Sequence, residues 1–343
     1  MLDFCLAKTK IQKKLIRDML FADDAAIVAH SQEDLQKLMD RFADACKEFG
    51  LTISIKKTEV MGQEVSKEPE ILINNQKLVV AESFIYLGST ITNDLSLKKE
   101  LDRRIGRASA TFAKLRKRVW ENGKLTIGTK IAVYRACVLS TLLYGSESWA
   151  TYATQEKRLN SFHLGNLRRI LGIKYYHRIT NNEVLDRAKM DSIQSLLKQR
   201  RLRWLGHVHR MPDGRIPKDL LYGELSDGKR PQGRPKQCFR NVCRNDLRSC
   251  GIDVDTWEAI AANRSAWKLT VKKGVAHSEA RSRQEAEEKR QLRKEKEKNP
   301  HTSVNSAQSR EAAYTCDLCG RECGAHIGLI SHKRKCSRTL SSS

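Results

Sequence analysis

The sequence predicts an α+β fold, and three observations predict it. Short apolar runs separated by turn residues fill residues 1–95, and apolar residues recur at helical spacing over residues 96–210. Cys and His residues then gather in residues 312–343, in the spacing of a small ββα module. The length of 343 residues is typical of two or three domains. We expect a basic, loop-rich connector over 211–278 and a charged helix with a linker over 279–311.

The chain is strongly basic, with 64 Lys and Arg residues against 40 Asp and Glu residues and a formal net charge of +24. Each phosphate that a cation neutralises releases a condensed counterion, so this charge favours RNA or DNA as the partner. The cations are spread over many segments and not gathered on one amphipathic helix, which disfavours a membrane surface. No apolar run is long enough to span a bilayer. The sequence does not indicate an oligomeric state.

The start of the chain, Met1–Cys5, lacks the basic region and the apolar stretch of a secretory signal. We therefore expect a nuclear or cytoplasmic protein, not a secreted one, with its cysteines reduced.

Two short apolar runs within residues 15–29 flank a pair of aspartates. This pattern predicts a β-hairpin with Asp23 and Asp24 at its turn. Adjacent carboxylates repel each other unless a divalent cation lies between them, and oxygen ligands suit Mg²⁺. In nucleotidyl transfer such ions activate the attacking hydroxyl and stabilise the leaving oxygen. Taken alone, however, most such pairs are solvated turn residues.

A helix and several strands are expected after this hairpin. Ser31 is a plausible N-cap with Asp34 three residues later, and Gly50 is a natural residue to follow the last turn. The apolar positions between them share one helical face. They are Leu35, Leu38, Met39, Phe42, Cys46 and Phe49. The alternation over 51–55 predicts a half-buried strand.

Further strand-like runs cover 71–73, 78–80 and 84–87, with Asn74-Asn75 predicting a tight turn between the first two.

Three motifs occur in a recognisable order. They are Phe21-Ala22-Asp23-Asp24, the segment from Gly50 to Glu59, and the segment from Phe84 to Ile91. Together they resemble the palm of non-LTR retrotransposon reverse transcriptases, over about residues 15–95. The resemblance implies a partial polymerase palm of β-hairpins and a helix, followed by a helical thumb-like region.

The resemblance also implies roles for particular residues. Asp23 and Asp24 would be metal-binding carboxylates for Mg²⁺, and Lys56 or Lys57 would donate a proton to the pyrophosphate leaving group. Phe84 and Tyr86 would shape the primer grip. The alternatives stay open: Lys56 and Lys57 as a solvated strand end, and the two aromatic residues as ordinary strand core.

The polymerase site of this family needs a further aspartate and a nucleotide-binding segment ahead of the Asp-Asp motif. Asp3 and Asp18 precede that motif, but neither stands in a matching context. We therefore expect this chain alone not to polymerise DNA.

The central region predicts a series of helices with basic faces. Their ranges are 96–120, 127–143, 155–171, 181–189 and 192–209. Cations adjoin an aromatic residue twice in this region, at Trp120 and at Trp204, and such segments can contact phosphates while the ring stacks on a base. The expected contacts are Arg116, Lys117, Arg118, Arg200, Arg201 and Arg203. Tryptophans in such segments are, however, more often helix core than platforms for a base.

The connector adds Arg234 and Lys236 as expected nucleic-acid contacts. The stretch from 201–208 to 233–236 resembles the tail of the same retrotransposon proteins. Helices are expected over 237–249 and 255–271. A separate, solvated charged helix is expected over 279–298, where 14 of 20 residues are charged, followed by a disordered linker.

The C-terminal module has the pattern Cys-x₂-Cys-x₁₂-His-x₃-Cys. Its expected ligands are Cys316, Cys319, His332 and Cys336, and the expected ion is Zn²⁺. The first pair would lie on a hairpin and the second pair one helical turn apart, so the four side chains can surround a tetrahedral ion. Cys323 and His326 are competing ligands, with Cys323 more naturally a core residue.

These observations leave two functional hypotheses. The first is the C-terminal part of an RNA-directed DNA polymerase, which binds nucleic acid and zinc and is inactive as a polymerase by itself. The second is a retroelement-derived zinc-finger protein that binds nucleic acid without a catalytic role.

Overall fold

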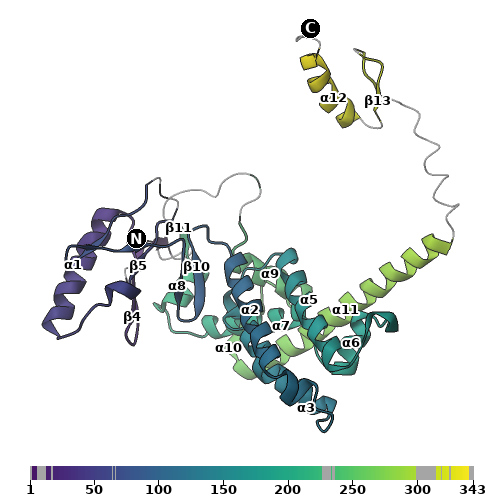
Figure 1. The fold of residues 1–343 in the computed structure, drawn as a ribbon, viewed down its shortest axis with the longest axis horizontal. Helices are drawn as coiled ribbons and strands as arrows, with labels where there is room; N and C mark the ends of the chain where they lie inside the picture. Colours follow the sequence, from purple (N-terminus) through teal and green to yellow (C-terminus); the bar gives the residue numbers. More distant parts are fainter. Residues whose placement is uncertain are drawn as a thin grey trace. The chain divides into compact units, whose positions relative to one another are not determined.

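The computed structural model describes residues 2–5, 13–16, 18–63, 65, 67–225, 233, 236–298, 314–317, 319–323 and 326–339. The chain divides into a first unit, residues 1–280, and a second unit, residues 281–343 (Figure 1). The fold is largely helical with small sheets, which agrees broadly with the predicted α+β class. No helix in the described ranges is both long and apolar enough to cross a bilayer.

Three hydrophobic cores build the first unit. The smallest holds Met39, Ile71 and Leu78 among its buried residues. A larger core fills the helical body between Leu101 and Leu197. A third core begins at Leu202 and extends to Val275.

The strands at the start of the chain form two antiparallel sheets. One sheet has the order β11-β1-β2 and joins Glu224–Leu225, Leu2–Cys5 and Lys13–Ile16. The other is the hairpin of β3, Asp18–Phe21, and β4, Asp24–Ile27. The hairpin predicted around the aspartate pair is therefore present.

Helix α1, Gln32–Glu48, has the predicted caps. The Ser31 side chain accepts a hydrogen bond from the Asp34 amide at 3.1 Å. At the other end the amide of Gly50, whose φ is 68°, donates to the carbonyl oxygen of Lys47, and the Leu51 amide donates to that of Cys46. This is the Schellman pattern that glycine favours.

Two details after α1 differ from the prediction. Phe49, expected on the buried face, is 80% exposed because it lies beyond the last helical residue. Residues 51–55 form no strand; a 3₁₀ turn, Ile55–Lys57, follows them. The amide and the hydroxyl of Thr58 both donate to the Ser54 carbonyl oxygen, and these local bonds replace the ladder that a strand would need.

Strand β5, Glu59–Val60, pairs in parallel with β8, Val79–Val80. Between them, β6, Leu72–Ile73, pairs with β7, Gln76–Lys77, around the predicted Asn74-Asn75 turn.

Both turn asparagines have positive φ, 49° and 62°, as a tight hairpin turn of the primed type requires. The returning strand starts two residues earlier than the predicted 78–80 run, because the two-residue turn fixes the register from Asn75 onward.

Strand β9, Ser83–Tyr86, pairs with β10, Ser89–Thr92, around a turn at Leu87 and Gly88. Both turn residues have positive φ, 46° and 79°.

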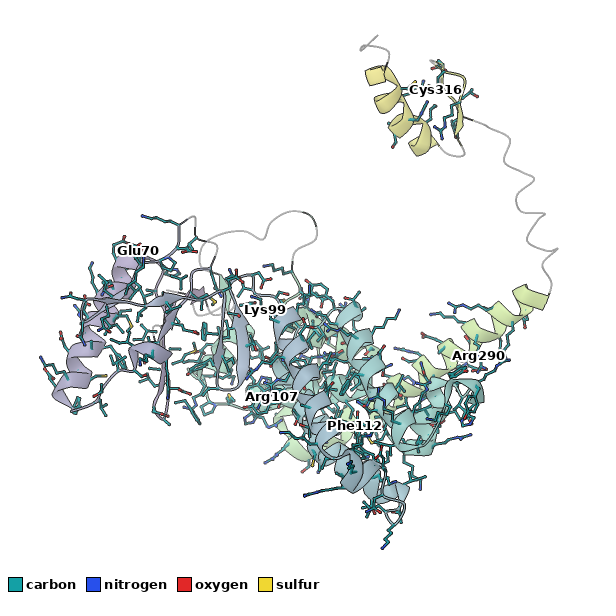
Figure 2. All side chains as sticks on the ribbon, in the orientation of Figure 1. Glu70, Lys99, Arg107, Phe112, Arg290 and Cys316 are labelled. Atoms are coloured by element: carbon teal, nitrogen blue, oxygen red, sulfur yellow. The ribbon has the colours of Figure 1, made fainter. Side chains whose placement is uncertain are left out.

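The helical body contains the helices predicted over 96–209. They are α2 (Lys98–Lys114), α3 (Ile127–Val133), α4 (Ser140–Leu142), α5 (Ala153–Ile170), α6 (Asn181–Ala188) and α7 (Ile193–His209). The segment Arg116–Trp120 after α2 and the segment Tyr134–Leu139 between α3 and α4 are π-helical. Each π-helical turn holds an extra residue, so it shifts the side chains that follow around the helix. Figure 2 shows Phe112 of α2 among the side chains of this body.

Helix α7 belongs to two cores. Ile193 and Leu197 lie in the core of the helical body, whereas Leu202, Leu205 and Val208 lie in the third core. The third core also includes side chains of later helices. These helices are α8 (Ile216–Tyr222), α9 (Phe239–Ser249), α10 (Trp257–Ala262) and α11 (Arg264–Lys298).

Two helix predictions in this region are corrected. Helix α8 was not expected; Pro217 lies in its first turn, where a missing amide hydrogen costs nothing. The helices expected over 255–271 and 279–298 have different limits: α10 ends at Ala262, and α11 runs without a break through residue 278. Asn263 starts α11, because its side-chain oxygen accepts hydrogen bonds from the next turn.

The second unit contains the predicted ββα module. Strands β12, Tyr314–Thr315, and β13, Glu322–Cys323, form an antiparallel hairpin, and helix α12, His326–Thr339, follows it. The linker expected to be disordered, residues 299–311, lies outside the described residues.

Candidate nucleic-acid and metal sites

The aspartate pair lies at the exposed tip of the β3–β4 hairpin. Ala22 and Asp23 form the turn, and Asp24 begins β4 opposite Phe21. Ala22 has a φ of 52°, a left-handed conformation that costs energy for a residue with a Cβ. Both aspartates are exposed, and so is Phe21, at 63%. Both carboxylates are therefore accessible from solvent.

Asp23 and Asp24 do not belong to a cluster of three or more potential metal ligands among the described residues. Within the described ranges, the one group of three or more potential ligands close enough to share an ion is the set of Cys316, Cys319, His332 and Cys336. No third acidic side chain of the described residues therefore joins Asp23 and Asp24 at that separation.

A hydrogen bond ties the aspartate hairpin to the second hairpin. The hydroxyl of Tyr86 in β9 donates to the main-chain carbonyl oxygen of Met19 in β3 at 3.0 Å. Tyr86 and Phe84 are both half-buried. Since the bond joins residues 67 positions apart, it fixes the two hairpins side by side.

The turn of the second hairpin is held by the helical body. The Tyr144 hydroxyl donates to the Leu87 carbonyl oxygen at 3.1 Å, and the guanidinium of Arg104 lies 4.5 Å from the centre of the Tyr144 ring. Arg103 and Arg104 both donate to the carbonyl oxygen of Gly88. The hairpin that resembles a primer grip is thus attached to α2 and to the loop after α4.

Glu100 supports this attachment from the core side. It is buried, accepts a hydrogen bond from Arg104 at 2.6 Å and accepts another from the Thr90 amide at 2.8 Å. Burial alone would raise the pKa of Glu100, but the hydrogen bonds from Thr90 and Arg104 outweigh it and hold that pKa below its ordinary value.

Lys56 and Lys57, the expected proton donors, lie exposed in the 3₁₀ turn after residue 54. They are not at the end of a strand, because residues 51–55 do not form one.

The basic segment after α2 has exposed cations and a buried aromatic residue. Arg116, Lys117 and Arg118 are exposed, and Arg116 forms an ion pair with Glu121. Trp120 is buried, its ring stacks 4.7 Å from that of Phe112, and its indole donates to the Phe112 carbonyl oxygen. Trp120 is therefore a core residue, whereas the three cations are exposed to solvent.

The sequence prediction for Arg201 is corrected. Arg201 is 2% exposed, and its guanidinium contacts Asp246, Glu156 and Thr151 inside the fold. Burial alone would lower the pKa of Arg201, but the hydrogen bond and charge of Asp246, with Glu156, keep it above its ordinary value. Arg201 joins α7 to α9, and an arginine with all its partners inside the fold does not contact phosphates.

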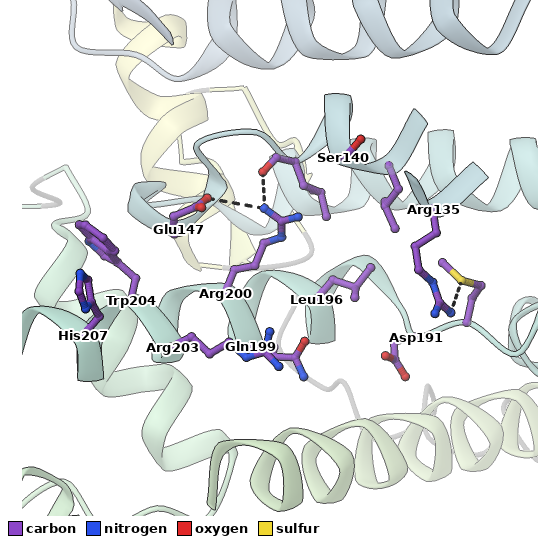
Figure 3. Close-up of a pocket in the computed structure, with 13 residues that line it drawn as sticks. Arg135, Ser140, Glu147, Asp191, Leu196, Gln199, Arg200, Arg203, Trp204 and His207 are labelled. Carbon is purple, nitrogen blue, oxygen red and sulfur yellow. Dashed lines mark hydrogen bonds and ion pairs between the residues drawn. The ribbon is translucent and has the colours of Figure 1, made fainter. Parts of the chain in front are cut away.

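A pocket of about 580 Å³ opens between α7 and the helix formed by α3, the π-helical segment and α4. Figure 3 shows Arg200 reaching across it toward Glu147, with Trp204 and His207 at one end and Arg135 at the other. Arg200 donates to the Leu143 carbonyl oxygen at 2.9 Å and lies 3.7 Å from the Glu147 carboxylate.

Arg203 also lines this pocket and is exposed. The sequence reasoning missed the contribution of Arg135, which comes from a different helix. The sequence does carry one signal of the pocket: Trp204 and His207, three residues apart, share one face of α7.

The two expected contacts in the connector have different outcomes. Lys236 is exposed and donates to the Asp94 carbonyl oxygen at 2.8 Å. Arg234 lies outside the described residues.

Four predicted ligands converge in the second unit. Cys316, Cys319, His332 and Cys336 place their ligand atoms within 4.8 Å of one another, and the Cys319 sulfur lies 3.1 Å from Nε2 of His332. Cys316 and Cys319 come from the hairpin side and the other two from α12. Lys333 of α12 also forms an ion pair with Asp317. This donor set could bind a metal such as zinc.

Neighbouring thiols of this cluster change the pKa of Cys336. The hydrogen bond with Cys319 raises the pKa of Cys336 to about 11, and burial and Cys316 act in the same direction. A bound cation reverses this effect because it stabilises thiolates. The side chains of the competing ligands, Cys323 and His326, lie outside the described residues.

Two cysteines and a histidine of the third core region lie in packed surroundings. Cys243 and Cys250 are buried in the third core, and burial raises the pKa of Cys243. His209 hydrogen-bonds through Nδ1 to the Tyr222 hydroxyl at 2.7 Å.

Comparison with known proteins adds a distant relationship. No protein-family model matches the chain. The chain is 23% identical over 286 residues to an uncharacterised transposon-derived protein of Caenorhabditis elegans, a match that covers 78% of this chain and 100% of that protein. It is 20% identical over 184 residues to the RNA-directed DNA polymerase of the mobile element jockey from Drosophila melanogaster. That match covers 51% of this chain and 20% of the polymerase, so the chain corresponds to about a fifth of that relative.

The chain is therefore distantly related to retrotransposon proteins of the reverse-transcriptase kind.

Proposed function

We propose that this chain is a nucleic-acid-binding part of a retrotransposon-type reverse transcriptase. Residues 1–95 derive from the palm, 96–210 form a thumb-like body, 211–278 a basic connector and 312–343 a zinc finger. One observation carries the proposal: the exposed Asp23-Asp24 tip lies on a hairpin that Tyr86 joins to a second hairpin. The chain that contains this arrangement is a distant relative of an RNA-directed DNA polymerase.

The residues at the tip support a specific role. Asp23 and Asp24 would hold Mg²⁺, whose chemistry in nucleotidyl transfer is to activate the attacking hydroxyl and to stabilise the leaving oxygen. Lys56 or Lys57, both exposed, would supply a proton to the pyrophosphate. Phe84 and Tyr86 would position the primer strand through the hairpin that they help to build.

The described residues offer no third carboxylate at the tip, so we propose that this chain alone does not extend a primer. A primer-extension assay with Mg²⁺ or Mn²⁺ tests this. Template-dependent synthesis that is lost in Asp23→Asn would contradict it.

The exposed cations of the helical body support the binding role. Arg116, Lys117 and Arg118 lie on one short segment, and Arg203 and Lys236 are exposed elsewhere in the first unit. We assign phosphate contacts to these residues and to Arg200 and Arg234, and exclude the buried Arg201.

Equilibrium binding to RNA, single-stranded DNA and duplex DNA over a range of salt concentrations tests the proposed function. We expect the logarithm of the binding constant to fall linearly with the logarithm of the salt concentration, because phosphate contacts release counterions. Absence of binding at low salt would contradict the proposal.

The metal cluster favours a second candidate, in which the finger alone binds nucleic acid and the first unit has no catalytic role. Cys319→Ala would then abolish binding, and Lys117→Ala with Arg118→Ala would leave it unchanged. The reverse pattern supports the first candidate.

A further inference from the structure

We propose that the pocket between α7 and the α3–α4 helix binds one nucleotide of a single-stranded nucleic acid, with its base against Trp204 and its phosphate at Arg203. The inference rests on the proposed function and names the form of nucleic acid that this site takes. The pocket is about 580 Å³, within the range of about 300–1,000 Å³ that suits one small ligand or one nucleotide unit. Duplex bases are stacked on each other and cannot enter such a pocket.

Trp204 provides the surface for a base. The other four tryptophans, Trp120, Trp149, Trp257 and Trp267, are buried, with exposures of 2–8%. Trp204 is half-buried and lines the pocket, and its ring centre lies 5.3 Å from that of His207. Stacking of a base on an aromatic side chain contributes about five- to 150-fold in affinity and tolerates any base.

Arg203 provides the charge. It is exposed on α7 one position before Trp204 and has no hydrogen-bond or ion-pair partner among the described residues. The acidic Glu147 on the opposite wall faces Arg200, so its charge is offset within the pocket. Asp191 is the other acidic residue of the lining, and Arg135 lies at the same end of the pocket (Figure 3).

The loop after α4 links this pocket to the second hairpin. Leu143 and Glu147 line the pocket, and Tyr144 between them donates to the Leu87 carbonyl oxygen at the hairpin turn. Gly145, with a φ of 71°, lets the loop approach so closely that an added Cβ would lie 3.2 Å from the Ser89 hydroxyl. A nucleic-acid strand held at the hairpin that resembles a primer grip would therefore lie next to the wall of the pocket.

Tryptophan fluorescence of the full chain, titrated with an oligodeoxythymidylate of about ten nucleotides, tests the inference. We expect quenching of part of the emission, from the most accessible indole. Trp204→Phe should keep most of the affinity, since a phenyl ring also stacks, but lose the quenching. Trp204→Leu should weaken binding about five- to 150-fold. Arg203→Ala should also weaken binding, by about tenfold, and reduce its salt dependence by about one phosphate contact.

Arg248→Ala, at an exposed arginine of α9 that does not line the pocket, is the matched control and should leave affinity and quenching unchanged. Circular dichroism of each variant checks that it is folded, and Arg203→Ala tests the site even if Trp204→Leu is unstable.

The wild-type chain could bind in a salt-dependent way while Arg203→Ala and Trp204→Leu leave that binding unchanged. This result would overturn the assignment of the pocket and keep the proposed function. A wild-type chain that does not bind the oligonucleotide, RNA or duplex would overturn both. Equal competition by polyglutamate would assign the pocket to acidic peptides and overturn the inference.

Discussion

Arg201 and Asp246 form a buried, two-pronged ion pair: Nε of Arg201 lies 2.6 Å from one carboxylate oxygen of Asp246, and a second guanidinium nitrogen lies 3.2 Å from the other. The pair joins α7, which belongs to two cores, to α9 of the third core. It therefore fixes the region around the proposed nucleotide pocket.

Removal of one partner of this pair should destabilise the fold. Arg201→Ala leaves the Asp246 carboxylate buried without its cation, which should lower the free energy of unfolding by about 3–5 kcal/mol. Urea denaturation measures this loss. Arg203→Ala, two positions later and exposed, should change stability by no more than about 0.5 kcal/mol. Equal losses in the two variants would show that the buried pair has no special role.

Gly206 accommodates a tryptophan. A Cβ at Gly206 would lie 2.1 Å from the indole nitrogen of Trp267, whose N–H donates to the Leu202 carbonyl oxygen. Gly206→Ala should therefore cost about 1–3 kcal/mol through overpacking, although alanine is the better helix former.

Gly165→Ala in α5 is the matched control for that substitution. No described atom lies within 4 Å of its Cβ position, so this variant should gain about 0.5–1 kcal/mol. Thermal unfolding compares the two variants, and a stabilised Gly206→Ala protein would contradict the close packing.

His163 should make stability depend on pH. It is fully buried beside the Tyr134 hydroxyl, and burial lowers its pKa to about 4, against about 6.5 in the unfolded chain. As pH falls from about 6.5 to about 4, the unfolded state takes up a proton that the folded state refuses. Neutral His163 contributes its full stabilisation above pH 6.5, and about 3 kcal/mol of the free energy of unfolding should be lost as the pH falls to about 4.

His163→Gln removes the titrating group and keeps a polar side chain. The difference in unfolding free energy between wild type and variant should therefore change with pH between about 6.5 and 4, and stay constant above. A constant difference throughout would show that His163 titrates normally.

The C-terminal cluster should hold about one zinc ion per chain. Elemental analysis of the purified full chain should find it, and Cys319→Ala should lose it. Loss of zinc on acidification is also expected, because the ligands bind as thiolates and neutral imidazole. Cys137→Ala, at an exposed cysteine of the helical body, should keep its zinc. Zinc retained in Cys319→Ala would contradict the assignment.

Features set by neighbouring residues were predictable from the sequence. The cap at Ser31, the glycine after α1 and the Asn74-Asn75 turn depend on conformations and hydrogen bonds within a few residues. The spacing of the metal cluster is likewise local within each half, and the structure brings both halves together.

Features set by distant contacts were not predictable. Arg201 reads as a surface cation until Asp246, 45 residues later, is packed against it. The alternation over 51–55 gave no sign that Thr58 would close a turn on Ser54. Arg135 lies in the π-helical segment, far along the chain from the α7 residues that line the same pocket, so the pocket as a whole has no signature in the sequence.

The salt dependence of RNA binding tests the central claim, that cations of the helical body neutralise phosphates, most directly. The account predicts that Lys117→Ala with Arg118→Ala lowers the slope of log binding constant against log salt by about 2, one for each lost contact. The control, Lys272→Ala with Lys273→Ala, removes two exposed lysines of α11 and should leave the slope unchanged. A wild-type slope near zero, or a slope that the Lys117 and Arg118 substitutions leave unchanged, would contradict the account.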